Sequence, residues 1–144
     1  MIKSRGEPRG FAIRTLKNLD FVTAAFPAKE VHVVAQTGNS LLGLIVFPVV
    51  KNAHVPHEHL RVSDLVQQGW PAWNQISGTQ CETLGELLRN LRNAVAHGYW
   101  SFSSDSRECS KVRIAVELKD SWKVDMNCLD LQRFCRKFVE LLEP

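Results

Sequence analysis

The sequence has few cysteines, no long uninterrupted apolar run and no secretion-signal pattern, and each absence excludes a class of protein. The longest apolar run, Leu41 to Val50, contains Pro48 and is about half the length that a membrane span needs. The charged start of the chain lacks the apolar block of a signal peptide. The four cysteines show no CxxC or zinc-finger spacing. We therefore expect a cytoplasmic protein with no membrane partner and no metal, although four cysteines leave a disulfide pair open.

Motifs for nucleotide cofactors are also missing. Gly38 and Gly43 frame a short segment, but no Lys-Ser or Lys-Thr pair follows it, which excludes a P-loop. A Rossmann glycine fingerprint is absent as well. The sequence therefore predicts no cofactor.

The composition is that of an ordinary globular protein. With 144 residues, 44% of them hydrophobic and 23% charged, we expect a single domain over residues 1–144. The formal net charge of +3 is too small to establish a nucleic-acid partner. Basic residues gather in residues 1–17, of which residues 1–9 are expected to form a loose basic arm, since glycine and proline interrupt any helix there.

The spacing of apolar residues predicts two helices in the first third of the chain. The first runs from about Phe11 to Phe26 and ends before Pro27. The second covers about residues 28–47, although the valines at 33 and 34 leave a strand open. Residues 48–78 are expected to be irregular, with one or two helical turns at 63–68.

A third helix carries the clearest signal. Thr79 and Glu82 have the spacing of a capping box, a stripe of leucines continues to Val95, and Gly98 is placed to end the helix. Alternating patterns then predict strands at 99–102, 112–118 and 122–124. A closing helix capped by Asn127 follows. The expected fold is mainly α, a bundle of about four helices with a small antiparallel β hairpin or sheet after the third helix.

Three polar residues at the end of this third helix are the candidate site. Asn93 and His97 are four residues apart and lie opposite the leucine stripe, while Arg92 is about 140° from His97 and needs its long side chain to reach it. A simpler interpretation stays open. A histidine before glycine is good helix-capping chemistry, and an exposed Arg and Asn need no function.

The run from Arg92 to Gly98 resembles the signature of the HEPN superfamily (higher eukaryotes and prokaryotes nucleotide-binding). That signature is an Arg followed by a polar residue, here Asn93, with a His after four to six intervening positions near the end of a bundle helix. The order of helices also resembles the family over most of residues 10–143. Residues 31–36 and 39–44 are similar to a plasmid-borne, stand-alone HEPN branch.

The resemblance implies a metal-independent endoribonuclease, a toxin or defence effector that dimerises so that two motifs share one composite site. It implies RNA as substrate and an antitoxin protein as a candidate partner. RNA supplies its own 2′-hydroxyl nucleophile, so His97 would move a proton, Arg92 would stabilise charge on the phosphate, and Asn93 would orient either group. The products would carry 2′,3′-cyclic phosphate and 5′-hydroxyl ends. Two alternatives are a catalytically silent HEPN module that binds nucleotide or protein, and a helical scaffold in which the motif is only a cap.

Further residues are weaker candidates. Contacts to RNA are expected from a set of basic and aromatic residues around the motif and in the arm: Arg89, Tyr99, Trp100, Arg5 and Arg9. The aromatic residues would more commonly pack on the bundle. Three histidines at positions 54, 57 and 59 have a spacing that a metal would accept, but surface histidines in an irregular segment are the commoner case.

Overall fold

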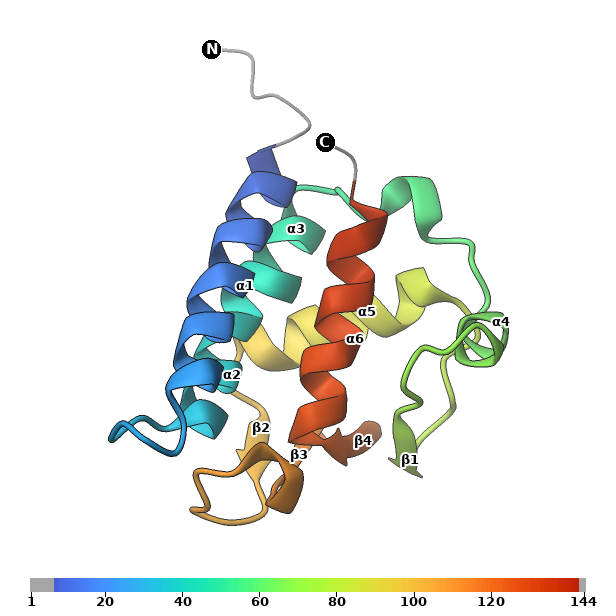
Figure 1. Cartoon of the computed structure of the whole chain (residues 1–144). Helices are drawn as coiled ribbons and strands as arrows, with labels where there is room; N and C mark the ends of the chain where they lie inside the picture. The colour runs from blue at the N-terminus through green and yellow to red at the C-terminus, as the bar shows by residue number, and fades with distance from the viewer. Residues whose placement is uncertain (1–6, 143–144) are drawn as a thin grey trace.

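The computed structural model describes residues 7–142, which form a helical bundle with a four-stranded antiparallel sheet at one end (Figure 1). The elements in chain order are α1 (Glu7–Ala25), α2 (Val33–Leu41), the π-helix η1 (Leu42–Val46), α3 (Phe47–Val50), the 3₁₀ turn η2 (Val55–His57), α4 (Val62–Gln67), β1 (Asn74–Ser77), α5 (Leu84–Ala96), β2 (Trp100–Phe102), the 3₁₀ turn η3 (Cys109–Lys111), β3 (Arg113–Leu118), β4 (Trp122–Asn127) and α6 (Cys128–Leu141).

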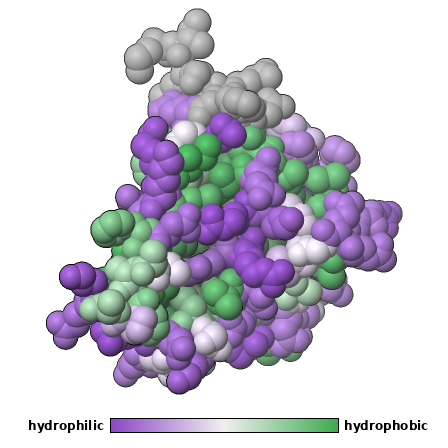
Figure 2. Space-filling view, in the orientation of Figure 1, coloured by the Kyte–Doolittle hydropathy of each residue, from purple (hydrophilic) through white to green (hydrophobic). Residues whose placement is uncertain are grey.

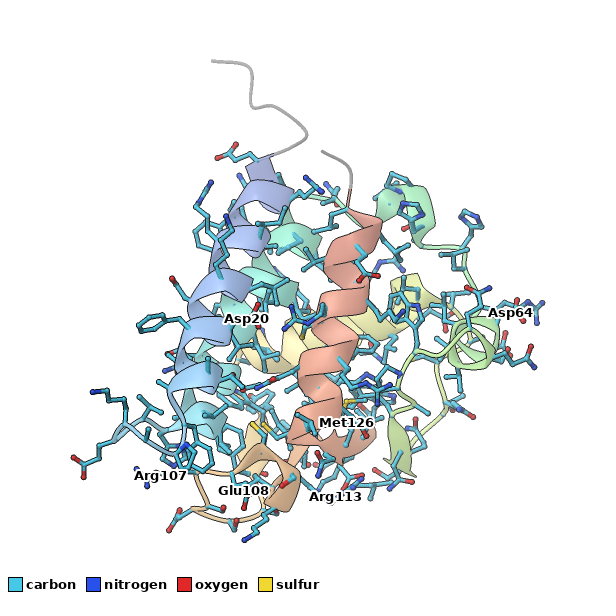
Figure 3. The ribbon with its side chains drawn as sticks, viewed as in Figure 1. Asp20, Asp64, Arg107, Glu108, Arg113 and Met126 are labelled. Atoms are coloured by element: carbon cyan, nitrogen blue, oxygen red, sulfur yellow. The ribbon has the colours of Figure 1, made fainter. Side chains whose placement is uncertain are left out.

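The helices surround a main apolar core that contains the leucine stripe of α5, and a second, smaller apolar cluster joins α2, η3 and the start of α6. Helix α5 packs on the π-helix η1 and on strand β3, whereas α1, α2 and α6 lie side by side in Figure 1. An ion pair links two of these outer helices: Arg136 Nη2 of α6 donates to Oδ1 of Asp20 of α1 at 2.6 Å (Figure 3). The expected mainly α fold is confirmed, but the sheet is larger than a hairpin.

Helix α1 begins earlier than the sequence predicted. Residues 7–9, expected in a loose arm, form its first turn, because proline is tolerated in the first turn of a helix where its missing N–H has no partner to lose. The rest of the arm, residues 1–6, lies outside the described residues. The helix ends at Ala25, close to the predicted end before Pro27.

The second predicted helix starts at Val33 instead of residue 28 and continues past Pro48. His32 caps its start, because its Nδ1 accepts a hydrogen bond from the backbone N–H of Ala35 at 3.1 Å. A π turn precedes Pro48, with the N–H of Phe47 donating to the carbonyl of Leu42, and such a shift is one way to admit a residue without an N–H. Residues 33 and 34 are helical and not a strand.

The segment Val33–Val50 has the length and hydropathy of a membrane span, but 61% of it is buried inside this fold. That burial is the pattern of a core helix in a soluble protein. Exposed apolar side chains occur both within this segment, at Leu42 and Val50, and outside it, and the face in Figure 2 shows green atoms between hydrophilic ones.

The third predicted helix, α5, is confirmed with a corrected start. Its cap is Thr83, which accepts a hydrogen bond from the N–H of Glu86, while the carboxylate of Glu86 accepts one from the N–H of Glu82. Thr83 and Glu86 repeat the Thr-x-x-Glu spacing of the predicted box four residues later, so the pattern itself did not distinguish the two positions. The leucine stripe is buried as expected.

The three predicted strands pair with a fourth. The order β1-β4-β3-β2 adds β1 at an edge, a short polar strand without an apolar alternation to reveal it. Buried residues of β3 and β4 alternate with outward ones such as Arg113, whose guanidinium makes two hydrogen bonds to the carboxylate of Asp125 (Figure 3). Asn127 caps α6 as predicted, accepting from the N–H of Leu129 at 2.8 Å.

The four cysteines are thiols, and three of them are buried. Cys109 and Cys128 face each other with their sulfurs 3.2 Å apart, too far for a covalent bond. Their neighbours Thr37 and Gln132 are joined by a hydrogen bond of 2.9 Å. The disulfide pair that the sequence left open is therefore absent from this structure.

Gly38 allows the sheet to approach α2, and we expect its replacement to be costly. A Cβ at this position would lie 2.6 Å from the ring of Trp100 and 2.8 Å from that of Phe102. We expect Gly38→Ala to lower the free energy of unfolding by about 1–3 kcal/mol through overpacking, measured by urea denaturation. The matched variant Gly10→Ala meets only the flexible end of Arg14 at 3.5 Å and should be neutral or slightly stabilising. Equal changes in the two variants would contradict this packing account.

Candidate functional site

The end of α5 fixes the backbone around His97. Hydrogen bonds run from the N–H of Gly98 to the carbonyl of Val95 and from the N–H of Tyr99 to that of Ala94, which is the pattern of a Schellman motif. Gly98 occupies its left-handed position with φ of +74°. The motif presents the exposed His97 side chain at the helix end, where its ring stacks near that of Tyr99 at a centroid distance of 6.0 Å.

Arg92 and Asn93 lie one turn earlier and are half-buried. Arg92 Nη1 donates a hydrogen bond of 2.6 Å to Asn93 Oδ1, so Asn93 holds the guanidinium. The backbone N–H of His97 donates to the carbonyl of Asn93 at 3.2 Å, as in any helix turn, but among the described residues no hydrogen bond joins their side chains. The structure thus brings Arg92 and Asn93 together within one protomer and leaves His97 separate from them.

A cavity of about 380 Å³ lies beside Arg92 and Asn93. Helix α5 contributes one wall through Arg89, Arg92 and Asn93. The segment after α3 contributes the polar residues of the opposite wall, which are Asn52, His54 and Glu58. Arg89 bridges the two walls, since its Nη2 lies 2.8 Å from Glu58 Oε2. His97 is not among the lining residues.

His54 is the unusual residue of this cavity. It is 4% exposed, and neither ring nitrogen has a hydrogen-bond partner. Its Nε2 lies 3.9 Å from Glu58 Oε2, beyond hydrogen-bond distance. Burial lowers the pKa of His54 because it desolvates the charged ring; Glu58 raises this pKa and Arg89 lowers it further. Burial therefore favours the neutral imidazole, in which one nitrogen donates and the other accepts.

The other residues predicted to contact RNA lie in different environments. Tyr99 is 42% exposed beside His97, whereas the half-buried Trp100 packs against Gly38 and Phe102. Arg89 is engaged with Glu58. Arg9 is half-buried on α1, and Arg5 lies outside the described residues.

The three-histidine segment is not a surface cluster. His54 is buried, His57 is half-buried and His59 is exposed, so they do not face one site together. Over residues 7–142, no group of three or more His, Cys, Asp or Glu side chains is placed to hold a metal ion. Sequence reasoning missed the burial of His54 because an irregular, proline-containing segment has no periodicity that marks its inner face.

A family model described as HEPN pEK499 p136 matches residues 1–144. The chain belongs to this HEPN family. No match was found among curated proteins or among solved structures. HEPN membership indicates a nuclease or a nucleotide-binding module.

Proposed function

We propose that this HEPN protein is a metal-independent endoribonuclease that cleaves RNA through attack of the 2′-hydroxyl on the adjacent phosphate. The observation that carries the proposal is the spacing of Arg92 and His97 at the end of α5, in a chain that matches a HEPN family over its whole length. In this reaction the 2′-oxygen forms a bond to phosphorus while the bond to the 5′-oxygen breaks. The products are a 2′,3′-cyclic phosphate and a 5′-hydroxyl.

The residues have separate roles in this reaction. The exposed imidazole of His97 moves a proton from the 2′-oxygen or to the leaving 5′-oxygen. Arg92 stabilises the charge that accumulates on the phosphate oxygens, and Asn93 fixes the direction of its guanidinium. Tyr99, exposed beside His97, offers a ring on which a base can stack.

We further propose that the protein works as a homodimer whose two motifs face one composite site. The separation of His97 from the cavity that Arg92 lines supports this, since a second protomer can present its own His97 beside Arg92. The biological setting that fits is a cytoplasmic, plasmid-borne toxin or defence effector held in check by an antitoxin protein.

The first test compares single-stranded RNA with DNA of the same sequence, incubated with purified protein in EDTA. We expect cleavage of RNA only, because DNA lacks the 2′-hydroxyl nucleophile. Cleavage of both polymers, or cleavage that requires added Mg²⁺, would contradict the mechanism. If neither polymer is cut across varied sequences, the protein is instead the catalytically silent binding module.

A further inference from the structure

We propose that the cavity between α5 and the segment after α3 is a phosphate subsite, in which His54, Arg89, Arg92 and Asn93 hold an RNA backbone phosphate next to the one being cleaved. This inference rests on the proposed function for the identity of the ligand. The site itself is argued from the side chains that line the cavity.

The first argument is the unsatisfied imidazole of His54. A buried polar group without a hydrogen-bond partner destabilises the fold, so a native protein that keeps one commonly reserves it for a ligand or a water. His54 lines a cavity of about 380 Å³, a volume within the range of small-ligand sites, roughly 300–1,000 Å³. The ring therefore lacks a hydrogen-bond partner and lies in the wall of a cavity large enough to hold one.

The second argument is the balance of donors and charges. Arg92 uses one N–H on Asn93 and has further donors, the Asn93 amide keeps its NH₂ group, and His54 adds a ring N–H. Two arginines line the cavity against one carboxylate, Glu58, which is already paired with Arg89. An oxyanion with several acceptor oxygens matches this set better than a cation or a neutral molecule does.

The third argument is position. Arg92 belongs to both the cavity and the proposed reaction centre, while His97 lies outside the cavity. In the proposed dimer the partner's His97 meets Arg92, whereas His54 belongs to the opposite wall, so we assign the phosphate beside His54 as a neighbour of the reacting one. Apolar side chains of Val49, Val50 and Val55 form the rest of the wall, where a sugar or base can pack.

The test follows the His54 ring by ¹H–¹⁵N NMR during titration with inorganic phosphate and, separately, with a 2′-deoxy dinucleotide that cannot be cleaved. We expect the His54 signals to shift with both probes. His54→Ala should weaken binding about tenfold, because alanine has no side-chain N–H and one hydrogen bond to a charged group is lost. Glu58→Gln should strengthen binding, because it removes the negative charge that pairs with Arg89, and glutamine keeps the size of this half-buried side chain. His59→Ala, at an exposed histidine outside the cavity, is the matched control and should bind as wild type does.

Two results would overturn the subsite: His54 signals that ignore both probes, or the same affinity in all four proteins. A response to inorganic phosphate alone would overturn the assignment to the RNA backbone. If His54→Ala does not fold, the opposite shift in affinity expected for Glu58→Gln decides the question. RNA cleavage measured on the same samples separates the two proposals: cleavage without a phosphate response removes only the subsite, whereas a phosphate response without cleavage removes only the nuclease function.

Discussion

Replacing His97 with alanine is expected to lower the rate of RNA cleavage by roughly 10²–10⁴-fold, the range typical for loss of a general acid or base. The side chain is exposed at the end of α5 and makes no hydrogen bond within the described protomer, so its removal should leave the fold intact. The measurement is the single-turnover cleavage rate, with circular dichroism and thermal melting to verify folding.

The control for this variant is His59→Ala, which removes an exposed histidine elsewhere on the surface. It should cleave at the wild-type rate. If His97→Ala cleaves as fast as His59→Ala, then His97 is a helix cap with no role in the chemistry, and the scaffold interpretation of the motif gains support.

Replacing Arg92 with lysine is expected to reduce cleavage by roughly 10²–10³-fold even though the charge is kept, a loss typical of removing one transition-state donor. A planar guanidinium can bind Asn93 and two phosphate oxygens at once, whereas an ammonium is a point charge with different geometry. Because lysine keeps the charge that attracts bound RNA but loses the planar donors that face the transition state, the loss should fall on kcat more than on KM.

The matched control is Arg61→Lys, an exposed arginine at the start of α4 away from the motif. We expect this substitution to change neither kcat nor KM. A large rise in KM with an unchanged kcat for Arg92→Lys would instead assign Arg92 to ordinary RNA binding.

Periodicity predicted the long elements of the fold because each buries one continuous apolar face. The leucine stripe of α5 and the apolar face of α6 could be predicted without information on the elements that pack against them. The sequence-based predictions were wrong where tertiary contacts determine the local structure. Strand β1 exists because β4 offers it an edge, and the helix at residues 33–50 passes Pro48 because a π turn shifts its hydrogen bonds.

The site was predictable in part. The spacing of Arg92 and His97 is a property of the sequence, and so is the helix end at Gly98. The cavity beside Arg92 was not predictable, because half of its wall comes from residues 52–58, an irregular segment whose contacts depend on the chain before and after it. Burial of His54 and the Glu58–Arg89 ion pair are consequences of that tertiary placement.

The measurement that tests the central claim most directly is mass analysis of the RNA ends produced in EDTA by the wild-type protein beside folded His97→Ala and Arg92→Ala variants. We expect 2′,3′-cyclic phosphate and 5′-hydroxyl ends from the wild type and almost none from either variant. Equal amounts of the same products from all three proteins, or 5′-phosphate ends from the wild type, would contradict the proposed metal-independent mechanism at Arg92 and His97.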